Sequence, residues 1–472
     1  MKLFFKGKWF EGTNPIAVCN PFDGSVVDEV PTATAEQVQE AIEGATQGAQ
    51  QMRSVSGYDR SLFLRKAANL MLDRIEDLAE TISLEEGKTL KESRAETMRA
   101  VATMELCAEE AKRIAGEVLP LDGASGTAGK MGWTIKVPCG VVAAITPFNY
   151  PLNLVCHKVG PALAAGNSVI IKPASDTPLT SLKLVEILLE AGCPPFGVAC
   201  LTGGGATVGT ALCQDPRIRK ISFTGSQTVG ESICRMAGMK RVTMELGSNS
   251  PLVVLPDADL EKVVSAIAFA GFANAGQVCI SAQRVIVDAA IHDDLIKLLP
   301  DRISAMRAGN QMEKETDVGP MVRESDAQRV SQWIDEAVAS GAQLICGGQR
   351  HKAVIQPAVL TGVTRDMKIA KEELFGPAVG ILKSTNIESA IEEANHSPYG
   401  LSAAIFTQDI DAAMKFAHRV ESGNIHINWG PLWRTDMMPY GGLKQSGLGK
   451  EGPRYAMEEM MESKAIVIHS DF

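Results

Sequence analysis

Cys279 is the residue around which the chemistry of this sequence can be built. It ends the run Gly276-Gln277-Val278-Cys279, which follows an alanine-rich segment and precedes a β-branched run at residues 284–287. A thiolate in such a loop can act as a nucleophile. Because the chain has 10 cysteines and a free cysteine usually packs as a small hydrophobe, the residues that accompany Cys279 must decide between chemistry and packing.

Three other segments supply the residue types that a nucleophilic mechanism needs. They are residues 146–151 (TPFNYP), 244–247 (MELG) and 373–377 (ELFGP). An amide such as that of Asn149 can stabilise a negative oxygen, and a carboxylate such as that of Glu245 can activate water. Alone, such an asparagine favours a turn and such a glutamate favours a cap or an ion pair. The four segments together favour a catalytic site.

In order and spacing these segments resemble the NAD(P)-dependent aldehyde dehydrogenase superfamily, over essentially the whole chain. The run at residues 433–442 (WRTDMMPYGG) is similar to the branch of lactaldehyde, phosphonoacetaldehyde, succinic semialdehyde and non-phosphorylating glyceraldehyde-3-phosphate dehydrogenases. The resemblance implies oxidation of a small aldehyde, hydroxylated or anionic, to the carboxylic acid. Two departures are Phe148, where tryptophan is more usual, and Gly247-Ser248-Asn249, where Gly-Gly-Lys is usual. Neither replaces a reacting group.

The resemblance also implies a role for each reacting group. Cys279 adds to the aldehyde carbon, because that carbon must become tetrahedral before it can lose a hydride. The side-chain amide of Asn149 and the backbone N–H of Cys279 stabilise the oxygen of the thiohemiacetal. Hydride transfer then leaves a thioester, and Glu245 is expected to activate the water that hydrolyses it.

A nicotinamide cofactor is expected from the same resemblance, with NADP favoured over NAD. Lys172-Pro173-Ala174-Ser175 resembles the adenosine-ribose site, where many relatives carry a glutamate that repels a 2′-phosphate, and the uncharged Ser175 leaves room for one. Residues 223–230 follow a strand and open a helix, as a phosphate-binding turn requires, whereas no strand precedes the literal G-x-G-x-x-G at residues 447–452. The expected cofactor-binding residues are Thr146, Pro147, Phe148, Lys172, Ala174, Ser175, Gly205, Gly209, Phe223, Thr224, Gly225, Ser226, Val229, Leu246, Gly247, Glu373 and Phe375.

Two arginines are candidates for binding the far end of the substrate. Arg434 lies in the run that borders the aldehyde entrance in resembling enzymes, and Arg99 lies in a long helical pattern. An arginine offers a planar fork that matches carboxylate, phosphate or sulfonate oxygens. The alternatives are that Arg434 pairs with Asp436 or a neighbouring subunit and that Arg99 is on a solvated helix face. We expect Arg434, Arg99 and Asn149 to contact the substrate.

The composition and charge of the chain argue against several other classes of function. The formal net charge is −10, which argues against a general nucleic-acid or anionic-membrane partner. No apolar run is long enough for a membrane span, and no export signal is visible. The cysteines form no Cys-x-x-Cys, so we expect no metal site and a reducing cytoplasm.

The order of predicted elements indicates an α/β protein with the aldehyde dehydrogenase fold. Buried strands at residues 141–145, 168–172, 198–201, 220–223 and 241–245 alternate with helical patterns, as in a Rossmann-like doubly wound parallel sheet. We assign residues 1–119 and 140–247 to the cofactor domain and residues 248–445 to an α/β catalytic domain. Residues 120–139 and 446–472 are assigned to a small β oligomerisation domain, as the resemblance implies, and a homodimer or homotetramer is expected.

Two alternatives remain open at this stage. A CoA-acylating relative would use the same cysteine but pass the acyl group to a thiol, and such enzymes commonly lack a glutamate at the position of Glu245. A non-catalytic protein on the same fold is also conceivable, because fold does not determine function.

Overall fold

The first of two large sheets contains the strands predicted between residues 140 and 245. The computed structural model describes residues 1–469, and in it this sheet has the order β2-β1-β9-β8-β7-β10-β11-β21. β9, β8, β7, β10 and β11 are parallel neighbours, so the predicted parallel sheet is confirmed. The strands are β1 (Leu3–Phe5), β2 (Lys8–Phe10), β7 (Val141–Ile145), β8 (Ser168–Lys172), β9 (Val198–Cys200), β10 (Ile218–Thr224), β11 (Arg241–Glu245) and β21 (Gly447–Leu448).

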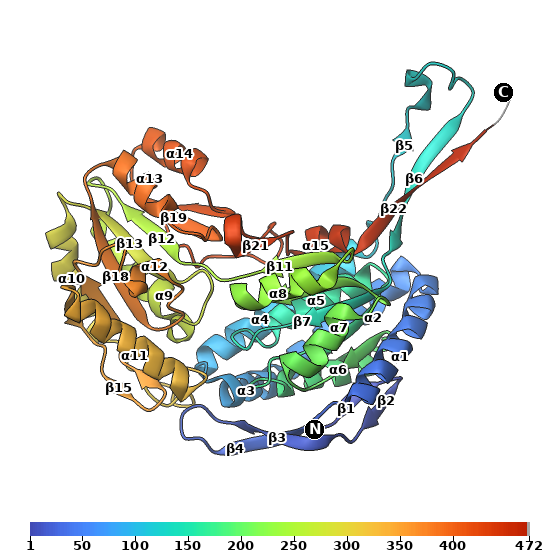
Figure 1. Ribbon diagram of the computed structural model, residues 1–472, viewed down its shortest axis with the longest axis horizontal. Helices are drawn as coiled ribbons and strands as arrows, with labels where there is room; N and C mark the ends of the chain where they lie inside the picture. The colour runs from blue at the N-terminus through green and yellow to red at the C-terminus, as the bar shows by residue number, and fades with distance from the viewer. Residues whose placement is uncertain (470–472) are drawn as a thin grey trace.

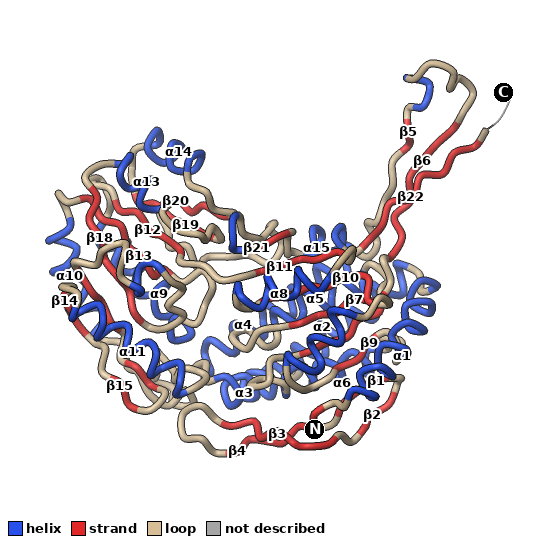
Figure 2. Tube along the Cα trace, in the orientation of Figure 1, coloured by secondary structure: helices blue, strands red, loops and turns tan. Residues whose placement is uncertain are grey.

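Helices cover both faces of this sheet, which makes the layers of a doubly wound fold (Figure 2). Side chains alternate along each strand, so Val142 and Ala144 join one core while Val141 and Ala143 join the other. The first core packs against α2 (Gly57–Asp73), α3 (Ile75–Glu86), α4 (Leu90–Glu110), α5 (Asn153–Ala164), α6 (Leu179–Ala191) and α15 (Pro453–Glu459). The second packs against α1 (Ala35–Ser54), α7 (Thr210–Gln214) and α8 (Gln227–Ala237).

A second sheet lies beside the first, in the order β14-β17-β18-β13-β12-β19-β20 (Figure 1). Within the described residues of this second sheet, β14 and β17 form the only antiparallel pair, and the other neighbouring strands are parallel. The strands are β12 (Ser250–Val254), β13 (Ala282–Asp288), β14 (Gln343–Cys346), β17 (Ala358–Thr361), β18 (Ala378–Ser384), β19 (Ser402–Phe406) and β20 (Asn424–Ile427). The helices are α9 (Leu260–Phe272), α10 (His292–Ser304), α11 (Glu324–Ala339), α12 (Lys368–Lys371), α13 (Ile387–Asn395) and α14 (Ile410–Arg419).

A narrow three-stranded arm projects from the first unit (Figure 1). It consists of β5 (Val118–Leu119), β6 (Met131–Pro138) and β22 (Met461–Ile468), and β22 pairs with β6 along its whole length. Two small ladders, β3 (Thr13–Cys19) with β4 (Val26–Thr32) and β15 (Arg350–His351) with β16 (Val354–Ile355), complete the strands described. Strands from the two segments assigned to the oligomerisation domain, residues 120–139 and 446–472, are therefore neighbours.

The C-terminal segment assigned to the oligomerisation domain begins at residue 446, and its described part lies partly in the first unit and partly in the arm. β21 pairs with β11 in the first sheet, and α15 packs in the first core. Glycine is required at 447 because φ is +147° and a Cβ would collide with the backbone of Met244. Residues 461–468 lie in the arm, and the last three residues of the predicted segment, 470–472, lie outside the described residues. The proposed domain boundaries stay a prediction.

Local signals in the sequence explain where several helices begin. α1 begins with a capping box, in which the Thr34 side chain accepts from the N–H of Gln37 and the Gln37 side chain accepts from the N–H of Thr34. The apolar face of α2, which includes Leu64, Ala67, Ala68 and Met71, is buried, whereas Leu72 is exposed and Ile75 begins α3. Within residues 1–469, no helix is long and apolar enough to cross a membrane.

Candidate active site

A cavity of about 870 Å³ lies between the two units, at the carboxyl ends of the strands of the first sheet. The last residues of β7, β8, β10 and β11 line it, as expected for an open parallel sheet. Every residue that the sequence predicted for the site lines this cavity: Thr146, Pro147, Phe148, Asn149, Lys172, Ala174, Ser175, Gly205, Gly209, Phe223, Thr224, Gly225, Ser226, Val229, Glu245, Leu246, Gly247, Cys279, Glu373, Phe375, Arg99 and Arg434.

Cys279 stands in a loop between α9 and β13, as predicted. Its Sγ lies 3.4 Å from the hydroxyl oxygen of Tyr440, which is itself buried. Burial raises the pKa of the Cys279 thiol to about 12, while the Tyr440 contact acts in the opposite direction. In the protein alone the sulfur is therefore a thiol at neutral pH, and it must lose its proton before it can attack.

Asn149 reaches from the end of β7 toward the same loop. Its side-chain Nδ2 donates to the backbone oxygen of Gln277 at 2.7 Å, two residues before Cys279. The residue is almost fully buried, with 4% of its surface exposed. An amide held in this way is a preorganised donor in the wall of the cavity that Cys279 also lines.

Glu245, at the end of β11, is buried, and its carboxylate lacks hydrogen-bond partners in the described part of the chain. Within residues 1–469 neither of its carboxylate oxygens has a hydrogen-bond partner. Burial, together with the charge of Glu451, raises the pKa of Glu245 well above its ordinary value. Buried carboxylates are usually paired, so a free and desolvated carboxylate that opens onto a cavity is suited to accept a proton from water.

A second buried carboxylate accompanies Glu245. Glu451 accepts from Lys158 Nζ at 2.7 Å and from Arg434 Nη2 at 3.2 Å. These two cations hold the pKa of Glu451 below its ordinary value against the opposite effect of burial. The two glutamates thus have environments that push their pKa values apart, an arrangement typical of proton-transfer sites.

The other end of the cavity fits a dinucleotide. α8 begins directly after β10, and its first residues face the cavity without a side-chain cap from Ser226, which leaves N–H donors for phosphate oxygens. The Oγ1 of Thr146 is buried and has no partner among residues 1–469. Glu373 accepts from the N–H of Ser248 at 2.9 Å, and a Cβ at position 247 would collide with its carboxylate. These groups would hold the phosphates and riboses of NAD(P), which supplies the hydride acceptor when bound.

The two candidate arginines have different partners from those considered in the sequence. Arg99 makes a two-pronged ion pair with Asp436, at 2.7 and 3.2 Å, so its helix faces the cavity. Arg434 pairs with Glu451 instead of Asp436, and its guanidinium carbon lies 3.8 Å from the centre of the Tyr440 ring. Within the described residues the Nε of Arg434 has no partner. The suggested Arg434–Asp436 pair was therefore wrong.

Several residues of the cavity wall were missed by sequence reasoning. Tyr440, Arg323 and Arg329 line the cavity, and Lys158 lies behind Glu451. Lys158 carried a usable signal, because it is a lysine within a largely apolar stretch, residues 152–165, and such a charge is rarely buried without a partner. The others carried none, because segments far apart in the chain bring them to the site: Arg323 and Arg329 come from the start of α11, and Tyr440 from a later loop.

Comparison with known proteins decides the family, since the model of the "Aldehyde dehydrogenase family" matches residues 9–466. The chain belongs to the aldehyde dehydrogenase family. The 3-sulfolactaldehyde dehydrogenase of Priestia aryabhattai is 46% identical over 467 residues, which cover 99% of this chain and 98% of that protein.

Solved structures of aldehyde dehydrogenases are similar over the same length. Aldehyde dehydrogenase 21 of Physcomitrella patens, in complex with the reaction product succinate, has a TM-score of 0.96 at 37% identity and covers 99% of this chain and 98% of its own. Glyceraldehyde-3-phosphate dehydrogenase GapN of Methanocaldococcus jannaschii, complexed with NADP, has a TM-score of 0.93 at 38% identity and covers 97% and 99%. The aldehyde dehydrogenase fold predicted from the sequence is confirmed.

As a family member, this aldehyde dehydrogenase oxidises an aldehyde to the carboxylic acid with a nicotinamide cofactor and is of the non-acylating type. The predictions of family and reaction class are confirmed, and the two alternatives, a CoA-acylating enzyme and a non-catalytic protein, are set aside.

Proposed function

We propose that Cys279 is the nucleophile, Asn149 the donor to the oxyanion and Glu245 the general base of this aldehyde dehydrogenase. The Asn149 amide lies against the Cys279 loop, which supports its role as a donor to the thiohemiacetal oxygen. The free, buried carboxylate of Glu245 supports its role in activating water for thioester hydrolysis. Phe148 and Ser248, the two departures from the usual family pattern, contribute a ring edge against Phe375 and an N–H to Glu373.

We propose further that the substrate is a small aldehyde, hydroxylated or anionic, and that an anionic group at its far end is bound by the arginines. The observation that carries this proposal is the presence of Arg99 and Arg434 in the wall of the same cavity as Cys279, in a protein of net charge −10. The names of the similar proteins agree with it, because 3-sulfolactaldehyde and glyceraldehyde 3-phosphate are both anionic aldehydes and succinate is an anionic product.

A panel of aldehydes tests this proposal at fixed enzyme concentration. We expect kcat/KM for 3-sulfolactaldehyde, glyceraldehyde 3-phosphate, phosphonoacetaldehyde or succinic semialdehyde to exceed that for propanal by at least about tenfold, because a desolvated charge pair contributes more than about 1.4 kcal/mol. Lactaldehyde separates the effect of the hydroxyl from that of the charge. Equal or higher kcat/KM for propanal would show that the arginines do not select an anion.

We propose NADP as the preferred cofactor, with Ser175 beside the adenosine ribose. Ser175 is exposed at the cavity wall, after Lys172 at the end of β8. Its neighbour Asp176 binds Arg323 from the second unit, with Nε and Oδ1 2.8 Å apart. A guanidinium therefore lies next to the residue that would face a 2′-phosphate.

Ser175→Glu is expected to lower the kcat/KM ratio of NADP to NAD by at least about tenfold, because a carboxylate repels the 2′-phosphate and accepts from the ribose hydroxyls. Initial rates with both cofactors at saturating aldehyde measure the ratio. Ser175→Gln, which has the same length but no charge, is the matched control and should largely retain NADP use. An unchanged ratio in the glutamate variant would place the ribose elsewhere.

The remaining expectations stay proposals. The projecting β6–β22 arm, with Val118, Met131 and Ile468 exposed on it, supports a homodimer or homotetramer in which another subunit covers the arm. We also retain the division into cofactor, catalytic and oligomerisation segments, and a cytoplasmic location, as predictions.

A further inference from the structure

A buried cluster of charges lies behind Asn149, on the side away from the cavity. Lys88, with 1% of its surface exposed, sits in the turn between α3 and α4. Its Nζ donates to Glu96 at 2.6 Å and to the backbone oxygen of Asn149 at 2.7 Å. It also lies 3.7 Å from the centre of the Tyr150 ring. A buried lysine with this set of partners has few alternative positions.

Glu96 extends this contact along the segment that carries Asn149. Its second oxygen accepts from the N–H groups of Leu152 and Asn153, at 2.9 and 3.1 Å. The carboxylate therefore caps the start of α5, where backbone donors are otherwise free. Through Lys88 and Glu96, the turn before α4 and α4 itself hold the backbone on both sides of Tyr150.

The same cluster holds the loop that carries Cys279. Asn274 and Ala275 have φ values of +51° and +52°, and Gly276 follows with +71°. Non-glycine residues rarely adopt this left-handed conformation, and they persist in it only when their surroundings impose it. The N–H of Asn274 donates to Glu92 at 2.7 Å and its Nδ2 to Glu86 at 2.9 Å.

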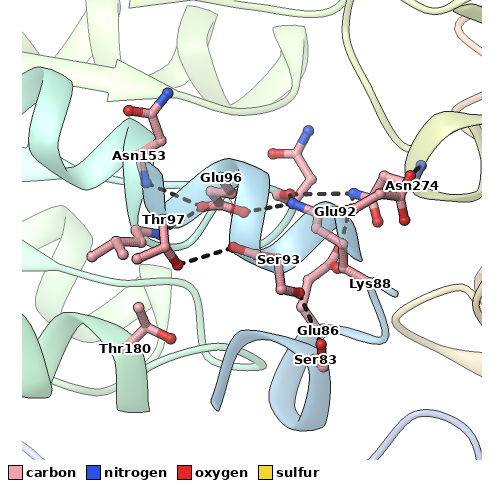
Figure 3. Close-up of polar contacts among 12 residues, drawn as sticks. Ser83, Glu86, Lys88, Glu92, Ser93, Glu96, Thr97, Asn153, Thr180 and Asn274 are labelled. Carbon is pink, nitrogen blue, oxygen red and sulfur yellow. Dashed lines mark hydrogen bonds and ion pairs between the residues drawn. The ribbon is translucent and has the colours of Figure 1, made fainter. Parts of the chain in front are cut away.

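The contacts that hold the Asn149 segment and those that hold the Cys279 loop meet at one atom. The backbone oxygen of Asn149 accepts from Lys88 Nζ and, at 3.2 Å, from Asn274 Nδ2. In Figure 3, Lys88 lies between Glu96 and Asn274, with Glu92 and Glu86 on the Asn274 side. One carbonyl thus joins the peptide of Asn149 to the strained turn that precedes Cys279, from the side opposite to the reacting groups.

We propose that Lys88 is a positioning residue, which aligns the Asn149 amide with the Cys279 loop through the Asn149 carbonyl. The proposal rests on the oxyanion role proposed above for Asn149. Lys88 does not itself line the cavity and has no contact with Cys279 among residues 1–469, so its effect must pass through its neighbours Asn149 and Tyr150, which do line the cavity. A shift of the amide by even about 1 Å costs about 100-fold in an oriented reaction.

Two reactions of the same sulfur separate positioning from folding. Cys279 can be acylated by p-nitrophenyl acetate, where the sulfur displaces p-nitrophenolate through a tetrahedral oxyanion that Asn149 stabilises. It can also be alkylated by iodoacetamide, where the sulfur displaces iodide from a CH₂ group and no oxyanion forms. The first rate is followed by p-nitrophenolate absorbance and the second by mass spectrometry of the Cys279 peptide.

The variant to test is Lys88→Met with Glu96→Gln, which removes both buried charges and leaves no unpaired carboxylate from that pair. We expect acylation to fall by about 10- to 100-fold and alkylation by less than about threefold. Lys220→Met is the matched control, because Lys220 is also fully buried in the first unit but does not line the cavity. It should leave the ratio of the two rates unchanged.

Asn149→Ala distinguishes failure of this inference from failure of the proposed function. If Asn149→Ala does not slow acylation, the oxyanion assignment is wrong and Lys88 has no amide to position. If it does, combining it with the Lys88 and Glu96 changes should cause no further loss, because both act at one donor. Multiplicative losses, an unchanged ratio of the two rates, or equal falls in both rates with lower thermal stability would overturn the positioning role.

Discussion

A Glu245→Gln enzyme is expected to release about one equivalent of reduced cofactor per active site and then almost cease turnover. Addition of Cys279 to the aldehyde and loss of hydride need the sulfur and the oxyanion donor, whereas hydrolysis of the thioester needs a base for water. Glutamine preserves the shape of the buried side chain but removes that base. Stopped-flow absorbance of the reduced nicotinamide separates the burst from the steady state, which should fall by at least about 100-fold.

Cys279→Ala is the companion variant and should show neither burst nor turnover. The pH dependence of the wild-type steady state supplies a second check. Burial and Glu451 raise the pKa of Glu245, so hydrolysis should be lost on acidification at a pH above the ordinary carboxyl range of about 4. A normal steady-state rate without a burst in Glu245→Gln would remove Glu245 from the mechanism.

The architecture that presents these groups was predictable because its signals are local. The five central strands of the first sheet are short and apolar and are separated by helical patterns, so their parallel order follows from burial on both faces. The capping box of Thr34 and Gln37 at the start of α1 is local in the same way. Asn149, Lys172 and Glu245 could then be placed near one another, because each lies at or just beyond the carboxyl end of a strand of one sheet.

Contacts between distant segments were not predictable in this way. Arg99 and Asp436 are 337 residues apart, and Lys158 and Glu451 are 293 apart. No local pattern says which arginine Asp436 will bind, and the nearer one in sequence, Arg434, binds Glu451 instead. The partner of Lys88 was not predictable for the same reason, because its hydrogen bond to the carbonyl of Asn149 forms only when α4 is packed against α5. Pairing of buried charges depends on tertiary packing.

Arg434→Ala is expected to cost about 2 to 4 kcal/mol in kcat/KM for an anionic aldehyde, or about 30- to 1,000-fold, mostly through KM. The guanidinium lies over the ring of Tyr440, whose hydroxyl contacts Cys279 Sγ, and its Nε has no partner among residues 1–469. It therefore retains an N–H donor close to the sulfur that binds the aldehyde. Arg99 has less capacity to bind the substrate, because two nitrogens of its guanidinium already bind Asp436.

Propanal is the internal control for the structural effect of the same substitution. Loss of the Arg434 contacts with Glu451 and Tyr440 should affect the oxidation of every aldehyde. Loss of a contact with an anionic group should affect only the charged aldehydes. Arg323→Ala is the matched arginine variant; since Arg323 binds Asp176 beside the proposed ribose site, it should not alter the preference between the two aldehydes. A fall of similar size for propanal and the anionic aldehyde, or a loss of thermal stability that accounts for the lost activity, would show that Arg434 supports the buried Glu451 and Tyr440 side chains and does not hold the substrate.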